Sequence, residues 1–412
     1  MNPDAGAYFS NRVPWDTGSP GRPARIFVDL DAIAGNVRYF VESVTPDTVV
    51  MAVVKADGYG HGAAVVAREA VAAGASSLAV ATIDEGVALR TFGIEAPILV
   101  LGPIDPSEAA TAVKSALTLT VSDARIVDVI SEAARRGEKA SPLPVHIKID
   151  TGMNRFGASP ETALDVCQAV VSRPELVLTG VYSHFADADN PDGTFSRAQA
   201  GVFDACLTEV RTAGISTGTV HLSNSAAALR SREWDHDMVR IGIALYGLAP
   251  APGLPLPAEL RPALSLRCRI AKLTDIQSGD SVSYGRTYVA EHQERVGLVP
   301  IGYADGYRRG LSGLGVMTAG EVSLPVRGRV CMDQTVVGIA PEATVSVGSD
   351  IDVISARPGA VNCVARIAET LGTIDYEVVT QLARRIPRYY TKGRRIEAVQ
   401  NLHTVDLISN AS

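Results

Sequence analysis

The feature that most constrains the fold is an eightfold alternation between short apolar runs and segments with helical spacing. In those segments apolar residues recur three and four positions apart, as in residues 63–73, 124–136, 160–171 and 196–213. Strands that alternate with helices form parallel sheets, and eight such strands close a (β/α)8 barrel. The expected strands span residues 49–55, 77–81, 98–101, 117–121, 145–150, 176–184, 220–223 and 238–241.

An open, doubly wound sheet is the competing architecture for this pattern. It is weakened because no G-x-G-x-x-G segment follows the first expected strand. The pattern changes within residues 249–262, which are dense in Pro, Gly and Leu. Beyond them β-type apolar runs dominate, and only residues 361–371 have clear helical spacing. We therefore expect a loop-like arm over residues 1–24, a (β/α)8 barrel over residues 25–250 and a mainly β domain over residues 251–412.

The charge balance argues against one class of partner. The chain has 38 Lys and Arg residues against 45 Asp and Glu residues, a formal net charge of −7. Nucleic-acid binding needs a concentrated basic surface, whereas the basic pairs of this chain are scattered along its length. No nucleic-acid partner is expected.

Cysteine usage and hydropathy indicate the compartment. Five cysteines, an odd number with no close pair, predict free thiols in a reducing environment. No apolar run approaches the ~20 residues that span a bilayer. The first 25 residues also lack the apolar core of a secretory signal. We expect a soluble cytoplasmic protein with no membrane partner.

The first expected strand ends in a lysine, Lys55, and runs into a glycine-rich turn (residues 53–62, VVKADGYGHG). A lysine at the C-terminal end of a barrel strand faces the mouth where the active sites of such barrels lie. Partial burial lowers the pKa of a lysine, which can then act as a base or form a Schiff base. A surface lysine that merely ends a strand is the alternative interpretation.

Polar side chains also end several later strands. Lys148, His184 and Arg240 stand at three of these ends, and Asn224 and Ser225 follow a fourth. Each alone could be a structural polar group, but their convergence at one face is what a site built from several strand ends requires. Two aspartates follow His184 closely, yet no second His or Cys stands at ligand spacing. No metal site is predicted.

An ordered set of motifs narrows the interpretation. Residues 54–62 (VKADGYGHG) resemble the pyridoxal 5′-phosphate attachment motif of the alanine racemases. Further landmarks of that family follow in order within residues 25–395: KIDTGMNR at 148–155, SHF at 183–185, NSA at 224–226, RIGIALYG at 240–247, VSYG at 282–285, GYADG at 302–306, CMDQ at 331–334 and YEV at 376–378. The resemblance implies a barrel followed by a β domain. It also implies interconversion of L- and D-alanine, with D-alanine supplied to peptidoglycan, and a homodimer whose active sites are shared across the interface.

The resemblance also assigns roles to single residues. Racemisation removes a proton from one face of Cα and returns one on the other, which needs two acid/base groups. Lys55, which would carry pyridoxal 5′-phosphate covalently, serves one face, and Tyr284 from the partner subunit serves the other. The cofactor contacts implied besides Lys55 are Tyr59, His184, Asn224, Ser225, Arg240, Gly242, Ile243 and Tyr376. The implied substrate contacts are Arg155, Met332 and the access-channel residue Tyr303, and Lys148 matches a position that is carbamylated in many members.

Arg240 distinguishes between reactions. In the family an arginine faces the pyridine nitrogen of the cofactor, and arginine donates hydrogen bonds without giving up its proton. The ring then stays unprotonated and withdraws electrons weakly, which favours proton exchange. Amino-acid decarboxylases with a similar barrel have a carboxylate there. A broad-specificity or serine racemase, a decarboxylase on the same scaffold, and a cofactor-carrying protein without catalysis remain as alternatives.

Overall fold

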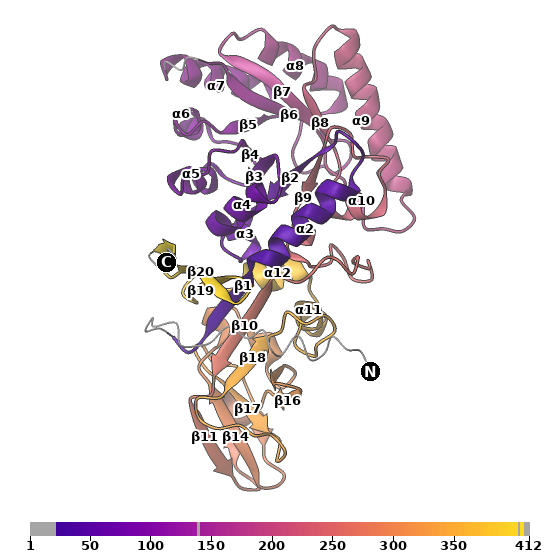
Figure 1. The fold of residues 1–412 in the computed structure, drawn as a ribbon. Coiled ribbons are helices and arrows are strands. Elements are labelled where there is room, and N and C mark those ends of the chain that lie inside the picture. The colour runs from indigo at the N-terminus through magenta and orange to yellow at the C-terminus, as the bar shows by residue number, and fades with distance from the viewer. Residues whose placement is uncertain (1–21, 138–140, 403, 408–412) are drawn as a thin grey trace.

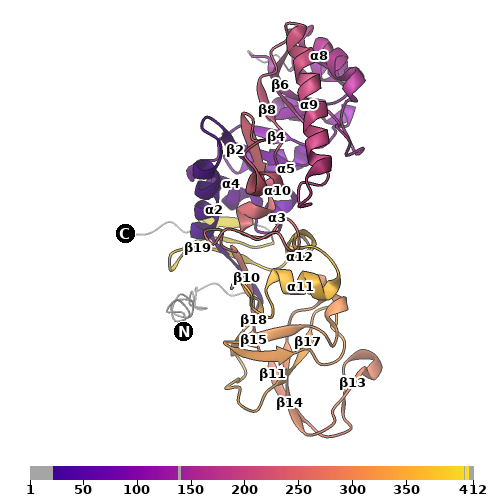
Figure 2. The same ribbon diagram turned by 90° about the vertical axis from the view of Figure 1, so that its right-hand side faces the viewer.

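The computed structural model describes residues 22–137, 141–402 and 404–407. The chain is elongated, with a barrel at one end and β-sheets at the other (Figure 1). Helices α11 (Val364–Leu371) and α12 (Asp375–Thr380) lie between the two parts (Figure 2). Most of the expected N-terminal arm, residues 1–21, falls outside the described residues.

Eight parallel strands close the expected barrel. Each strand pairs with the next in sequence, and the last pairs back with the first. Every strand coincides with one of the expected apolar runs, so the prediction of a (β/α)8 barrel is confirmed. The strands are β2 (Val49–Val53), β3 (Ser77–Val80), β4 (Ile98–Val100), β5 (Thr118–Val121), β6 (Leu143–Lys148), β7 (Leu176–Tyr182), β8 (Thr219–His221) and β9 (Met238–Ile241).

Helices form the outer layer of the barrel (Figure 1). They pack there through apolar stripes, as α7 does by burying Val127, Ile130 and Ala134. The helices of this part are α2 (Leu30–Ser43), α3 (Lys55–Tyr59), α4 (Ala63–Ala72), α5 (Ile83–Thr91), α6 (Ala109–Lys114), α7 (Ala124–Arg136), α8 (Ala163–Val171), α9 (Thr194–Thr212) and α10 (Ser225–Arg230). Short 3-10 turns are η1 (Pro106–Glu108), η2 (Pro160–Thr162) and η3 (Ile243–Tyr246).

The register that closes the barrel brings two predicted site residues together. β9 runs parallel to β2, with Met51 opposite Arg240 and Ala52 opposite Ile241. Lys55 follows shortly after β2. Lys55 and Arg240 therefore come from neighbouring strands at the C-terminal end of the barrel, where the active sites of this fold lie.

The C-terminal part is mainly β, as expected. It contains an eight-stranded sheet of order β16-β15-β18-β10-β1-β19-β20-β21, a three-stranded sheet β11-β14-β17 and a ribbon β12-β13. The strands are β10 (Leu264–Arg269), β11 (Lys272–Ile276), β12 (Ser281–Val282), β13 (Tyr288–Val289), β14 (Glu294–Val299), β15 (Val316–Ala319), β16 (Val322–Pro325), β17 (Thr335–Ile339), β18 (Asp350–Ile354), β19 (Arg388–Lys392), β20 (Arg395–Gln400) and β21 (Val405–Leu407). The 3-10 turns are η4 (Tyr284–Arg286), η5 (Tyr303–Asp305) and η6 (Arg309–Leu311).

One strand of the large sheet comes from the other end of the chain. β1 (Arg25–Asp29) pairs antiparallel with β10 and parallel with β19, whereas the expected boundary at residue 25 placed it with the barrel. The closed barrel offers no free edge for another strand. In the eight-stranded sheet, the β1 residues Ile26 and Val28 are fully buried. The chain then reaches the barrel through α2, which contacts α4 and β2.

Helix α12 is the one described helix of the C-terminal part that sequence periodicity does not indicate, because its six residues are too few for a clear pattern. It packs against α3, directly below the barrel (Figure 1). The approach is close: a Cβ on Gly60 would lie 2.0 Å from the backbone oxygen of Val379. This contact carries Tyr376 to the mouth of the barrel.

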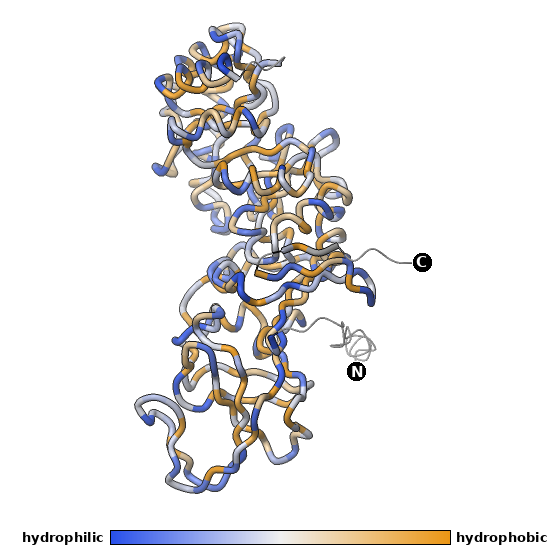
Figure 3. The backbone as a smooth tube through the Cα atoms, turned by 90° about the vertical axis from the view of Figure 1, so that its left-hand side faces the viewer, coloured by the Kyte–Doolittle hydropathy of each residue, from blue (hydrophilic) through white to orange (hydrophobic). Residues whose placement is uncertain are grey.

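Hydrophobic residues run through the strands and helices of both parts, and hydrophilic residues gather in the connecting loops (Figure 3). The described core is built mainly from Ala, Val, Leu and Ile. None of the described helices is long and apolar enough to cross a membrane.

Candidate active site

A cavity of about 560 Å³ opens at the C-terminal end of the barrel strands. The strands and the turns that follow them supply most of its lining, and α12 adds one residue. Eleven of the fourteen residues assigned from the sequence line this cavity: Lys55, Tyr59, Lys148, Arg155, His184, Asn224, Ser225, Arg240, Gly242, Ile243 and Tyr376. The other three, Tyr284, Tyr303 and Met332, lie in the C-terminal part and are described below.

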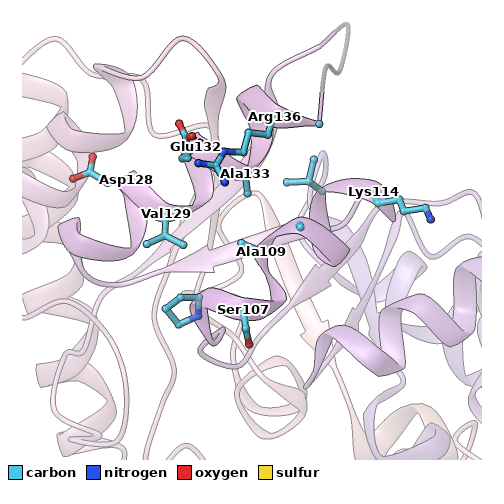
Figure 4. A pocket seen from close by; sticks show the side chains of 12 residues that line it. Ser107, Ala109, Lys114, Asp128, Val129, Glu132, Ala133 and Arg136 are labelled. Atoms are coloured by element: carbon cyan, nitrogen blue, oxygen red, sulfur yellow. Dashed lines mark hydrogen bonds and ion pairs between the residues drawn. The ribbon is translucent and has the colours of Figure 1, made fainter.

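A larger cavity, about 840 Å³, lies on the outside of the barrel between α6 and α7 (Figure 4). Charged residues such as Lys114, Glu132 and Arg136 border it. The described residues that line it include none of those assigned from the sequence, and none comes from a strand end of the barrel. The residues assigned from the motifs that line a cavity of the barrel are therefore gathered in the smaller one.

Lys55 begins a turn of left-handed backbone. Residues 56–59 have φ angles between 51° and 62°, a region that costs an L-residue other than glycine roughly 1–2 kcal/mol. Gly58 N–H donates to Val54 O (2.8 Å), and the buried Arg388 donates through Nε to Gly60 O (2.9 Å). Backbone strain of this kind is found at functional sites, where surrounding contacts hold it in place.

The amine of Lys55 lies in a half-buried, electropositive place. Burial lowers its pKa, and the nearby cations Arg155 and Arg240 lower the pKa further, while the Glu85 carboxylate opposes them. The unprotonated amine is both the nucleophile and the base. The surroundings therefore favour the reactive form of this lysine.

Arg240 is buried and donates to four acceptors. Its Nη1 donates to Nδ1 of His221 (2.9 Å), and its Nη2 donates to Nδ1 of His184 (3.0 Å). Nη2 also donates to the backbone oxygens of Ser183 (2.8 Å) and Leu222 (3.0 Å). Because arginine has no acceptor, both imidazoles accept at Nδ1 and carry their proton on Nε2.

The histidines around this arginine are neutral. Nε2–H of His221 donates to Nδ1 of His146 (2.8 Å). Burial and the charge of Arg240 lower the pKa of His146 to about 4 and hold the pKa values of His184 and His221 well below their usual range. The guanidinium therefore carries the positive charge of this network.

Tyr182 is a cavity residue that the sequence analysis missed. Arg240 Cζ lies 5.2 Å from the centre of its ring, and the ring stacks on His221 at 4.6 Å. Its hydroxyl bonds with Thr120 Oγ1 (2.9 Å), and burial raises its pKa to about 12. The available signal was its position, two residues before His184 at the same strand end.

Hydroxyl and N–H groups form a cradle on another side of the cavity. Gly242 N–H donates to Ser225 Oγ (2.9 Å), and a Cβ on Gly242 would lie 2.7 Å from the hydroxyl of Tyr59. Burial raises the pKa values of Tyr59 and Tyr376, so both stay protonated donors. Asn224 holds the local backbone by capping α10, where its side chain accepts from Ala227 N–H (3.0 Å).

The loop after β6 carries a second lysine to the cavity. Asp150 holds this loop by accepting from the backbone N–H groups of Gly152 (3.0 Å) and Arg155 (3.1 Å). Lys148 Nζ donates to Phe156 O and lies 5.0 Å from the centre of the Phe156 ring. Burial, with the charge of Arg155, lowers the pKa of Lys148 to about 8.

This set of groups suits an anionic ligand that carries an aldehyde. The described lining contains Lys55, Lys148, Arg155 and Arg240 but no aspartate or glutamate. Backbone N–H and hydroxyl donors bind a phosphate without needing a lysine, which leaves Lys55 for the aldehyde. The residues therefore fit pyridoxal 5′-phosphate. Within the described part of the chain, no group of three or more His, Cys, Asp or Glu side chains could hold a metal ion.

Tyr284, Tyr303 and Met332 lie on the surface of the C-terminal part, with exposed fractions of 72%, 40% and 54%. They belong to neighbouring segments: Tyr303 N–H donates to Cys331 O (3.0 Å), and Ser283 Oγ lies 3.2 Å from Cys331 Sγ. The three segments that carry these exposed side chains are therefore neighbours, and none of the three residues lines the cavity described above.

The backbone around Tyr284 is strained. Ser283 and Arg286 have φ angles of 66° and 50°, in the region that disfavours residues other than glycine. Ser283 is anchored through its hydroxyl, which donates to Arg329 O (2.7 Å). An exposed tyrosine held on a strained and anchored turn is typical of a functional position rather than of a loose loop.

Comparisons with known proteins point to one family along most of the chain. The alanine racemase N-terminal and C-terminal domain families match residues 28–250 and 263–390. An alanine racemase of Geobacillus stearothermophilus is 42% identical over 377 residues, 91% of this chain and 95% of the relative. The crystal structure of an alanine racemase from Bacillus anthracis with bound L-Ala-P has a TM-score of 0.87 at 37% identity, covering 93% of this chain and 99% of that one. A histidine racemase from Leuconostoc mesenteroides has a TM-score of 0.82 at 29% identity, with coverages of 91% and 99%.

Proposed function

This chain belongs to the alanine racemase family, and from that premise we propose that it uses pyridoxal 5′-phosphate to interconvert L- and D-alanine. The observation that carries the proposal is the pairing of β2 with β9, which sets Lys55 beside Arg240 in a cavity rich in cations. A lysine and an arginine at these positions match the chemistry expected of a racemase, which the ordered sequence motifs also imply.

Two sets of groups would hold the cofactor. Lys55 would bind its aldehyde covalently. The backbone N–H groups of Gly242 and Ile243, with the hydroxyls of Ser225, Tyr59 and Tyr376, would bind its phosphate. When bound, the cofactor delocalises the negative charge that forms when a Cα proton leaves. Tyr59 and Tyr376 serve as donors because their raised pKa values keep them protonated.

Arg240 would control which reaction follows. It donates to His184, His221 and two backbone oxygens, and it cannot accept a hydrogen bond. A donor that stays charged keeps the facing nitrogen of a ligand unprotonated. This limits electron withdrawal and favours return of the proton to Cα over loss of a carboxylate.

The two protons would be handled by different subunits. The Lys55 amine acts on one face of Cα, and Tyr284 of the partner subunit acts on the other. The support for this arrangement is that Tyr284 is highly exposed on its own chain while Lys55 lines the cavity. We propose a homodimer in which Met332 and Tyr303 are also presented to the partner's site.

Arg155 would bind the substrate carboxylate. It lines the cavity near Lys55 and Lys148. The positive charges of Arg155 and Lys148 repel each other, and a negative group between them would relieve this repulsion. A carbamate on Lys148 would supply that negative group and hold Arg155 in place.

The test is a panel of single amino-acid enantiomers incubated with the cofactor-loaded protein and analysed by chiral chromatography. We expect D-alanine from L-alanine and the reverse, and such a product would serve peptidoglycan synthesis. A related fold serves a histidine racemase, so faster racemisation of another amino acid would reassign the substrate. Release of CO₂ without racemisation would point to a decarboxylase instead.

A further inference from the structure

Glu85 lies in the first turn of α5 and was not among the residues assigned to the site. It forms a capping box with Thr82: Thr82 Oγ1 accepts from Glu85 N–H (3.3 Å), and Glu85 Oε2 accepts from Thr82 N–H (3.3 Å). Glu108 caps η1 in the same way, accepting from Asp105 N–H (2.8 Å). Capping therefore needs only one oxygen of such a carboxylate.

The Glu85 carboxylate makes two further contacts. Oε2 accepts from Ala81 N–H (2.7 Å), just beyond β3, and Oε1 accepts from Ala56 N–H (2.7 Å). Ala56 directly follows Lys55 and is the first residue of the left-handed turn, with φ of 52°. One carboxylate thus ties the end of β3 to the peptide bond that joins Lys55 to the turn.

Glu85 also sets the charge around Lys55. Arg155, in the loop after β6, and Arg240, in β9, line the same cavity as the lysine, and with burial their positive charges disfavour its ammonium form. Glu85, from α5, is the negative charge that acts on the lysine in the opposite direction. The other titratable groups that line the cavity are Tyr59, Lys148, Tyr182, His184 and Tyr376.

We propose that Glu85 is a positioning residue for Lys55: its carboxylate fixes the first peptide of the left-handed turn and places a negative charge beside the lysine. The inference rests on the proposed function of Lys55. Hydrogen bonds to a carboxylate are roughly twice as strong as those between neutral groups. They suit a place where the backbone is strained and the lysine must keep one orientation.

Glu85→Gln tests both parts of this role. A glutamine has one acceptor oxygen and an NH₂ donor, so it cannot accept from Ala56 and Ala81 on separate atoms, and it carries no charge. In the unliganded full-length protein, acetylation of Lys55 as a function of pH, followed by mass spectrometry, should show a midpoint shifted to lower pH. The rate at which pyridoxal 5′-phosphate attaches to Lys55, trapped by borohydride, should fall about tenfold.

Two variants serve as matched controls. Thr82→Ala removes the cap of the same helix, and Glu108→Gln removes the equivalent capping carboxylate in η1, while neither touches Ala56. Both should keep the wild-type midpoint and attachment rate. If Glu85→Gln does not fold, Glu85→Asp takes its place: it keeps the charge but is one methylene shorter, so attachment should slow while the midpoint stays near that of the wild type.

The inference is overturned if the Glu85 variant that folds matches the two controls in both measurements, because Glu85 would then act only as a cap. Neither measurement needs an amino-acid substrate. Absence of racemisation by the wild-type protein would therefore reject the proposed function without deciding this test.

Discussion

Nη2 of Arg240 donates to Nδ1 of His184 across 3.0 Å. Because an arginine only donates, this contact fixes which nitrogen of His184 carries the ring proton, and it leaves Nε2–H free to donate elsewhere. The same guanidinium holds His221 through its other terminal nitrogen. One buried guanidinium thus holds two histidines in fixed orientations. Most of the proposed chemistry depends on it.

Arg240→Lys should lower kcat for alanine racemisation on the order of a hundredfold. A lysine is a point charge on a flexible stem with three donor protons, so it cannot serve the four acceptors that Arg240 contacts. Arg230→Lys is the control, since Arg230 also donates to several backbone oxygens, among them those of Ala188 and Pro191, but does not line the cavity. Steady-state kinetics should separate the two variants, and equal losses would refute a special role for Arg240.

Gly242→Ala should weaken binding of pyridoxal 5′-phosphate about tenfold or more. The added Cβ would lie 2.7 Å from the hydroxyl of Tyr59 and intrude on the place proposed for the phosphate. Gly201→Ala, in α9 with no atom within 4 Å of its Cβ, is the control. Equilibrium titration with the cofactor measures the effect, and an unchanged affinity would mean that the phosphate binds elsewhere.

Lys55→Met should make the unliganded protein more stable at pH 7. The folded state lowers the pKa of Lys55 from its ordinary 10.5, so the unfolded chain binds the extra proton more readily. The lowered pKa therefore reduces the free energy of unfolding. This reduction is complete below the pKa of Lys55 in the folded state and disappears as pH rises from that value towards 10.5. Urea unfolding at several pH values tests this, with the exposed Lys114→Met as the control. A Lys55→Met protein that is less stable at pH 7 would contradict the account.

Lys148 should react with CO₂ in the folded protein. Its pKa of about 8 leaves part of the amine neutral near physiological pH, and a carbamate would meet the charge of Arg155. With ¹³C-bicarbonate, NMR should show a carbamate signal that grows between about pH 7 and 9 and is missing from Lys148→Arg. A signal that survives in Lys148→Arg would assign the carbamate to another amine.

Much of this site follows from local sequence. All eight barrel strands end or begin within a few residues of the expected positions, because their apolar runs are short and punctuated by turns. Lys55, Lys148 and Arg240 could be placed together because the C-terminal ends of parallel strands in a closed barrel meet at one face. The structure adds the register between β2 and β9, which places Arg240 on the strand next to the one that Lys55 follows.

The features that sequence could not predict depend on distant contacts. β1 leaves the barrel for a sheet whose other strands follow residue 263, and no local pattern encodes that pairing. Glu85 has a capping pattern like that of Glu108, and only the fold brings its second oxygen to Ala56. Tyr284 is predicted to act on the partner's site, and its high exposure on its own chain supports that hypothesis.

The central claim is that each active site combines Lys55 of one chain with Tyr284 of another. The direct test mixes two full-length variants, Lys55→Ala and Tyr284→Phe, under conditions in which subunits exchange, and measures D-alanine formation from L-alanine. Each variant alone should be nearly inactive, while random exchange should restore about a quarter of wild-type activity, since half the dimers then hold one intact site. A mixture that exchanges subunits yet stays as inactive as its parents would contradict the shared site.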